Sequence, residues 1–304
     1  MRISRGGLKS RSHYIIEIEQ DGKYGFGEGI ASAGLIESTF QAYDWQWLTN
    51  YEVEEFERLI LDRYNTIVYY EGLSTLRALF CAMLQAAAHV KESLGGQNES
   101  QSRRTKVLSS YASNIYWKED VDEMNDDIQK LLDNGIRSIK AHIGVVGAEE
   151  ELRRLDKMKA ISDCEKFMLD FNCGYKYEEA VRFAKNVVLS NHEYYWLEEL
   201  TRPDDLNAIR SLGNKYGAML AYGENHYGSQ FNFLARCGIG FLMPDLGRSV
   251  FPNELKELVT LAAMEPSTIT LHSYSSGVLL HQSIKTAMAN DGFDEVELDL
   301  SENA

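Results

Sequence analysis

From residue 106 onward, short apolar runs alternate with longer amphipathic segments, which is the pattern of repeated strand–helix units. Strands are predicted at residues 107–111, 136–142, 167–170, 194–197, 219–222, 240–243, 268–271 and 295–298. Helices are predicted between them, for instance at residues 120–132, 148–161, 177–189 and 253–263. Eight such units predict a closed β/α barrel, in which functional side chains lie at the carboxyl ends of the strands. A doubly wound open sheet is the structural alternative, but it gives no reason for the polar residues that end six of the strands.

The N-terminal third of the chain follows a different pattern. Alternation over residues 13–19, the turn signal Asp21-Gly22 and a return over residues 24–28 predict an antiparallel hairpin. The glycine-rich stretch 27–34 is expected to be a loop, either a plain connection or a lid over a site elsewhere. Helical patterns fill the rest of this part.

The polar stretch 95–104 is the predicted linker between the two patterns. We therefore divide the chain into an N-terminal α+β capping domain, residues 1–104, and a β/α barrel domain, residues 105–304. The predicted class is α/β, a modified TIM barrel with a cap.

Composition narrows the classes of function. With 304 residues, 44% of them hydrophobic, the chain is long enough for one barrel and an appended domain. Its net charge of −15 leaves no basic patch for nucleic acid or a membrane surface. The four cysteines show no CxxC spacing, so we expect free thiols in a reducing cytoplasm. No apolar run has the length of a membrane-spanning helix, and the polar start does not resemble an export signal.

Acidic residues end three successive predicted strands. Asp170 and Asn172 follow one apolar run two residues apart, so both side chains leave the strand on the same face. Glu198 and Glu224 end the next two strands. Three carboxylates on neighbouring strand ends are the ligands that a hard divalent cation such as magnesium prefers. The sequence therefore predicts a magnesium site.

Basic and acidic residues at the other strand ends predict proton transfer. Lys140 and His142 share one face of the second strand, where a lysine inside an apolar run needs a counter-charge or a function. Asp245 and His272 end the sixth and seventh strands, and a carboxylate beside an imidazole orients it and raises its basicity. Glu297 on the eighth strand is expected to project inward toward substrate. A single histidine is more often structural, so the pairing with Asp245 carries this prediction.

This ordered set resembles the enolase superfamily, specifically its mandelate racemase-like subgroup, over nearly the whole chain. That family carries Lys-x-Lys on strand two, Asp-x-Asn on three, Glu-Glu-Pro on four, Gly-Glu-Asn on five, Pro-Asp on six, His on seven and Glu on eight. The chain has KAH, DFN, EEL, GEN, PD, LHS and VELD at these places. The order of the motifs makes the resemblance specific.

The resemblance implies three magnesium ligands, which are Asp170, Glu198 and Glu224. It implies that Lys140 polarises the substrate carboxylate and that the Asp245–His272 pair is the base. The loop that begins at Glu28 would contact substrate, and we expect Asn172 to do so as well. A homo-oligomer is expected.

The chain also departs from the family pattern. His142 stands where many members have a second lysine that acts as a base, which disfavours a two-base racemase. Leu200 replaces a proline and Ser249-Val250 a pair of glycines. The muconate-lactonising branch has a lysine where Asp245 stands. The first strand of the cap and the C-terminal tail that returns to it are expected to be missing.

The expected reaction is removal of the proton alpha to a carboxylate. Magnesium stabilises the second negative charge that this step creates. If a hydroxyl lies beta to the carbanion, it leaves as water and a 2-keto acid results. We therefore expect an acid-sugar dehydratase acting on a small-molecule carboxylate. A racemase or epimerase is the second interpretation, and a non-catalytic metal-binding member of the fold is the third.

Overall fold

Eight parallel strands close into a barrel in the computed structural model, which describes residues 2–3, 6–7, 13–68, 73–95, 106–190 and 193–300. The strands are β5 (Ser109–Ile115), β6 (Ser138–His142), β7 (Lys166–Asp170), β8 (Leu197–Glu198), β9 (Leu220–Tyr222), β10 (Phe241–Leu242), β11 (Thr268–Leu271) and β12 (Phe293–Leu298). They pair in chain order around the barrel, and β12 closes it against β5. The predicted barrel is confirmed.

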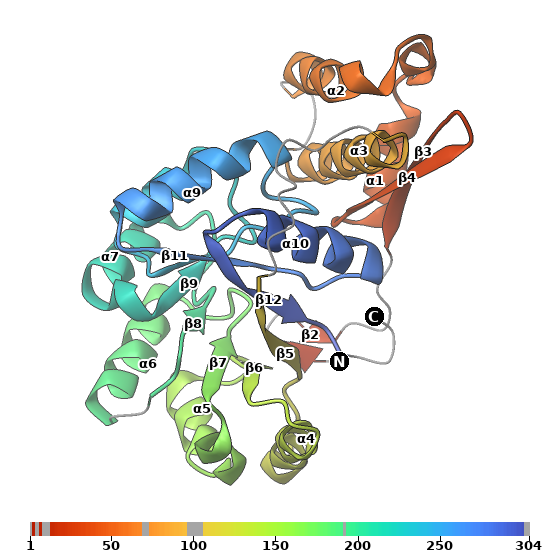
Figure 1. Cartoon of the computed structure of the whole chain (residues 1–304). Coiled ribbons are helices and arrows are strands. Elements are labelled where there is room, and N and C mark those ends of the chain that lie inside the picture. The colour runs from red at the N-terminus through yellow and green to blue at the C-terminus, as the bar shows by residue number, and fades with distance from the viewer. Residues whose placement is uncertain are drawn as a thin grey trace.

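Helices follow the strands and cover the outside of the barrel (Figure 1). They are α4 (Val121–Asp133), α5 (Ala148–Leu155), α6 (Tyr177–Ser190), α7 (Leu206–Tyr216), α8 (Gln230–Arg236), α9 (Leu255–Met264) and α10 (Gly277–Ala289). Three short 3-10 helices lie between them, at Lys159–Asp163, Gly217–Met219 and Pro252–Glu254. In α4, Asp120 caps the first turn and Met124, Ile128 and Leu132 place one apolar stripe in the core. Among the described residues, no helix is long and apolar enough to cross a membrane.

Three predicted elements differ most from the structure. β5 begins two residues later than predicted and runs on to Ile115, because its inner serines and asparagine hide the apolar pattern of a strand. β8 is only Leu197–Glu198, so most of the predicted run 194–197 lies before it. The helix predicted over 148–161 ends at Leu155, and the chain then turns so that Met158 and Ala160 are buried. The Asn125 side chain accepts a hydrogen bond from the Ala160 amide there, at 2.9 Å.

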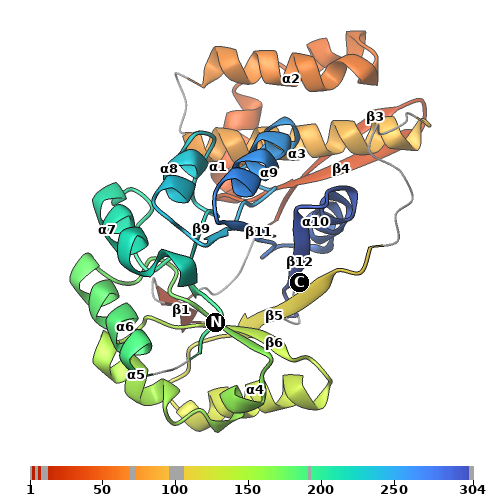
Figure 2. The same cartoon turned by 60° about the vertical axis from the view of Figure 1, so that its left-hand side comes forward.

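The cap is a hairpin packed on helices, and it lies above the barrel in Figures 1 and 2. Its elements are β3 (Tyr14–Gln20), β4 (Lys23–Gly29), α1 (Ala33–Gln41), a 3-10 helix (Gln46–Asn50), α2 (Val53–Ile67) and α3 (Leu73–Ser93). A separate two-stranded sheet pairs β1 (Arg2–Ile3) with β2 (Gly6–Gly7). The Asp21-Gly22 turn closes the hairpin with both residues at positive φ, as predicted. Most of the predicted linker, residues 96–104, lies outside the described residues.

The predicted loop 27–34 wrongly included Gly27 and Gly29, because β4 continues to Gly29. Gly25, Gly27 and Gly29 share one face of β4 and lie directly against α3. A Cβ at Gly27 would stand 2.0 Å from the carbonyl oxygen of Ala82, and at Gly25 it would stand 2.1 Å from that of Ala86. Glycine every second residue on the strand meets alanine every fourth residue on the helix. Close backbone packing, rather than flexibility, explains this composition.

Candidate active site

The three predicted metal ligands lie together at the carboxyl ends of adjacent strands. Asp170 ends β7 and pairs in register with Glu198, which ends β8, and Glu224 lies two residues beyond β9. Their side chains are buried, with 2%, 0% and 8% of the residue surface exposed. Buried carboxylates need a counter-charge. The carboxyl ends of β7, β8 and β9 therefore bring three carboxylates together at the barrel mouth, where they need positively charged partners.

The backbone turns sharply after two of these acids. Asn172 and Cys173 follow β7 at φ 44° and 59°, and Glu199 follows β8 at φ 45°. A glutamate in this left-handed region is uncommon, and such strain gathers at functional sites. The Cys173 amide donates to the Glu199 carbonyl at 2.6 Å, and the Glu199 carboxylate accepts from the Gly223 amide at 3.1 Å. These bonds fix the loops that carry the acids.

Lys140 lies at the centre of the mouth as a fully buried cation. Its Nζ atom is 3.1 Å from Oε1 of Glu198 and 2.8 Å from Oε1 of Glu297. Burial lowers the pKa of Lys140, but these two carboxylates outweigh it and raise the pKa well above its ordinary value. Lys140 is therefore a fixed ammonium group, suited to bind a carboxylate.

The Asp245–His272 pair forms as predicted. An isolated parallel bridge joins the two residues, and Nδ1 of His272 lies 2.7 Å from Oδ2 of Asp245. The other ring nitrogen, Nε2, faces Glu224 at 2.9 Å. Burial lowers the pKa of His272, but Glu224, Glu297 and Asp245 together raise it well above its ordinary value. The imidazole is held at both nitrogens by carboxylates.

Glu297 points inward from β12 and is ionised. Burial favours its neutral form, yet Lys140 and His272 lower its pKa from 4.5 to about 2. Its Oε2 atom accepts a hydrogen bond from the Ser273 amide at 3.0 Å. Glu297 thus links the lysine on one side of the mouth with the histidine on the other.

Both ring nitrogens of His142 are engaged by oxygen atoms. Nδ1 is 3.0 Å from Oδ2 of Asp170 and 3.2 Å from Oδ1 of Asn172, while Nε2 is 3.0 Å from the Ser113 carbonyl. Burial lowers the pKa of His142, but the bond to Asp170 outweighs it and raises the pKa. His142 is thus held beside Asp170, with neither nitrogen directed at a reacting group.

A magnesium ion fits these acids by the chemistry of the donors. Burial, more than the opposing effect of Lys140, raises the pKa of Glu198 well above its ordinary value, and Asp170 adds to the shift. A divalent cation would offset this crowding of carboxylates. In the described parts of the chain, however, no three His, Cys, Asp or Glu side chains already stand as a metal cage. Glu224 in particular is paired with Arg248 and His272, and would exchange those partners for a metal.

Glu28 lies at the seam between the cap and the barrel. Its carboxylate is 1% exposed and accepts hydrogen bonds from the Ser276 amide and hydroxyl, at 3.2 and 2.5 Å, and from the Leu279 amide at 3.2 Å. His13 is 2.6 Å away. These contacts place Glu28 at the first turn of α10, where a negative charge is favoured. Its role toward substrate stays a prediction.

The sequence reasoning missed three residues of the mouth. Arg248 donates from Nε to Asp245 at 3.1 Å and pairs through its other end with Glu224. Its position three residues after Asp245 was the available signal. Tyr116 stacks on His142 with ring centroids 5.0 Å apart, and Tyr274 approaches the same ring edge-on. Tyr116 was missed because β5 was predicted to end at Tyr111.

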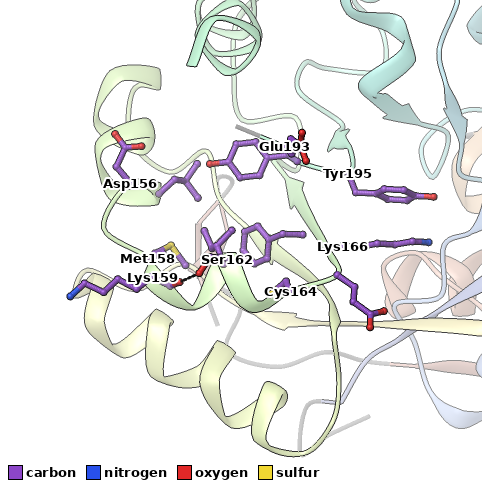
Figure 3. A pocket seen from close by; sticks show the side chains of 13 residues that line it. Asp156, Met158, Lys159, Ser162, Cys164, Lys166, Glu193 and Tyr195 are labelled. Carbon is purple, nitrogen blue, oxygen red and sulfur yellow. Dashed lines mark hydrogen bonds between the residues drawn. The ribbon is translucent and has the colours of Figure 1, made fainter. Parts of the chain in front are cut away.

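Figure 3 shows a different hollow, of about 840 Å³, at the amino ends of β7 and β8. Lys166 there pairs with Glu295 at 2.9 Å, and the Cys164 thiol donates to the Ala160 carbonyl at 3.7 Å. Lys166 and Cys164 are thus paired within the protein. The amino end of a β/α barrel serves stability rather than chemistry.

Comparison with known proteins shows the family to which the chain belongs. The family model described as Enolase C-terminal domain-like matches residues 123–303. A 3,6-anhydro-alpha-L-galactonate cycloisomerase of Streptomyces coelicolor is 26% identical over 169 residues, which are 55% of this chain and 46% of that protein. The match therefore spans less than half the length of that relative.

Two further matches cover more of the chain. An arabinonate dehydratase of Saccharolobus solfataricus is 21% identical over 288 residues, 90% of this chain and 75% of that protein. The crystal structure of a 3,6-anhydro-D-galactonate cycloisomerase from Zobellia galactanivorans superposes with a TM-score of 0.85 at 23% identity, covering 97% of this chain and 84% of that one. At this identity the likeness of the structures concerns the fold.

Proposed function

The chain belongs to the enolase superfamily, in its mandelate racemase-like subgroup, and from this premise we propose that it dehydrates an acid sugar, an aldonic or aldaric acid, to a 2-keto-3-deoxy acid. The observation that carries the proposal is the Asp245–His272 pair, 2.7 Å apart, in the same mouth as Lys140 and three carboxylates. A base opposite a carboxylate-binding cation is what removal of an alpha proton requires.

Substrate binding comes first. The ammonium group of Lys140, at the centre of the mouth, would bind one carboxylate oxygen of the substrate. Magnesium held by Asp170, Glu198 and Glu224 would supply the positive charge that stabilises the second negative charge formed on proton removal. His142 and Asn172 would hold Asp170 in place.

His272 would then carry the proton. Its Nε2 atom takes the proton from C2, and the electron pair of that bond forms the double bond to C3 as the C3–oxygen bond breaks. The same Nε2 returns the proton to the departing oxygen, so that water leaves and the enol tautomerises to a 2-keto acid. Asp245 orients the ring throughout. Glu224 is the first of the neighbours that raise the pKa of His272, so committing Glu224 to a metal would lower that pKa toward the range of a base.

A ring-opening isomerisation is the second candidate, and the names of two relatives favour it. If the oxygen on C3 belongs to an anhydro ring, the same elimination opens the ring and releases no water. A two-base racemase has less support, since both nitrogens of His142 are occupied.

The test is a panel of aldonic, aldaric and 3,6-anhydro-aldonic acids, each incubated with magnesium and assayed for 2-keto-acid formation. We expect turnover of at least one acid, and its loss when magnesium is chelated. Glu224→Gln should lower magnesium affinity measured by calorimetry, whereas Glu257→Gln on α9 should leave it unchanged. Equal affinity in both variants would remove Glu224 from the metal site, and no keto acid from any member of the panel would favour a non-catalytic protein.

A further inference from the structure

Two tyrosines at the rim of the mouth form a hydrogen-bonded pair. Tyr116 directly follows β5 and Tyr274 follows β11, strands that flank β12 in the barrel. Their hydroxyl groups are 3.0 Å apart. The pair therefore bridges the carboxyl end of β12, the strand that carries Glu297. Both side chains are half-buried, so they lie between the charged floor and the solvent.

His142 fixes the position of this pair. Its ring is parallel to that of Tyr116, with centroids 5.0 Å apart and planes 6° apart, and Tyr274 meets it at 69° with centroids 6.2 Å apart. His142 is itself held at one nitrogen by the Ser113 carbonyl and at the other by Asp170. A ring fixed at both nitrogens cannot turn freely, so the stacked Tyr116 is oriented as well.

The two tyrosines differ in chemistry from the rest of the mouth. Lys140, Arg248 and the carboxylates carry full charges, which suit the carboxylate end of a substrate and a metal. A phenol hydroxyl is neutral and both donates and accepts a hydrogen bond, as an alcohol does. Two such hydroxyls at contact distance can exchange their mutual bond for bonds to a ligand that carries several alcohol groups.

We propose that Tyr116 and Tyr274 are a recognition pair for the hydroxyl groups of the substrate chain beyond C3. The inference rests on the proposed function, which supplies the acid, and it narrows the substrate class to acids that carry hydroxyl groups beyond C3. A short 2-hydroxy acid bound at Lys140 would carry no hydroxyl groups beyond C3 for the pair to bind. The tyrosines thus select for chain length and hydroxylation without taking part in proton transfer.

The experiment measures binding in the presence of magnesium, independently of turnover. Calorimetric titration would compare D-gluconate, D-galactonate, D-arabinonate and L-arabinonate with glycolate, which retains only the carboxylate and the alpha hydroxyl. The variants are Tyr116→Phe and Tyr274→Phe, which keep the stacked rings. Tyr177→Phe, an exposed tyrosine at the start of α6, is the matched control.

We expect the wild type to prefer at least one aldonate over glycolate. Each rim variant should reduce that preference by about 3- to 10-fold, the value of one neutral hydrogen bond, while glycolate affinity and the control stay within about 2-fold. An unchanged preference in both variants overturns the inference. So does an equal loss for both kinds of acid, or a wild type that binds glycolate as tightly as every aldonate.

Keto-acid formation measured in parallel separates this inference from the proposed function. If the wild type forms no keto acid, yet the rim variants lose the preference for aldonates, the recognition pair stands and the dehydratase proposal fails. If the wild type dehydrates an aldonate and the preference is unchanged in both variants, only the recognition pair fails.

Discussion

Replacing Glu28 with glutamine tests whether this carboxylate serves the seam between cap and barrel or the substrate. One oxygen of Glu28 accepts from the Ser276 hydroxyl and the Leu279 amide, and the other accepts from the Ser276 amide and faces His13. A glutamine presents an oxygen on one side and an NH₂ group on the other. At least one backbone amide at the first turn of α10 therefore loses its acceptor.

The expected cost follows from these contacts. A buried donor left without its acceptor costs about 1–3 kcal/mol. Loss of a negative charge at a helix N-terminus costs about 0.3–1 kcal/mol more. We expect Glu28→Gln to lower the free energy of unfolding by about 1–4 kcal/mol. For a chain of this size, that corresponds to a fall in Tm of about 2–6 °C.

Scanning calorimetry of both proteins would measure this change. Glu17→Gln, an exposed carboxylate on the same hairpin, is the control and should leave Tm within about 1 °C. A Glu28→Gln protein that melts with the wild type but binds aldonates more weakly would refute the structural reasoning and restore Glu28 to the substrate site.

Two more outcomes follow from the packing and the charges. Gly27→Ala should lower the free energy of unfolding in urea by about 1–3 kcal/mol, because its Cβ would stand 2.0 Å from the Ala82 carbonyl oxygen. Gly34→Ala is the control and should not lower it, since no atom lies within 4 Å of the added Cβ. Equal losses in the two variants would contradict the packing argument. Glu297 has its pKa lowered from 4.5 to about 2, so the stability contributed by its ionised form is fully present above about pH 4.5 and is lost as the pH falls toward 2. The difference in unfolding free energy between wild type and Glu297→Gln should therefore shrink as the pH is lowered from 5 to 2, and a constant difference would count against this ion pairing.

The barrel and its acids could be predicted because each signal is local. Asp170 and Glu198 each end a short apolar run, and the spacing between runs fits one strand and one helix, so neighbouring strand ends follow from the order of the chain. The Asp245–His272 contact followed from the same argument. The two side chains are 2.7 Å apart, so residues predicted at the same position on successive strands are neighbours in the structure.

Other features depend on contacts between distant segments, which a single sequence does not reveal. The glycines of β4 indicate flexibility on their own, and only the position of α3 shows that they permit close packing. β5 was misplaced because serines that line a barrel break the apolar pattern. Arg248 bonds to Asp245, three residues away, and to Glu224, on another strand end, and only the first partner is visible in the sequence.

The measurement that tests the central claim most directly is solvent deuterium incorporation at the alpha carbon, followed by NMR with the best acid of the panel and magnesium present. Wild type should incorporate deuterium. His272→Asn keeps the side chain close to its shape but removes the titrating nitrogen, so the rate should fall by about 10²–10⁴-fold while magnesium affinity is retained. Asp245→Asn should show a smaller loss. Exchange at the wild-type rate in His272→Asn would contradict the account, because another group would then be removing the proton.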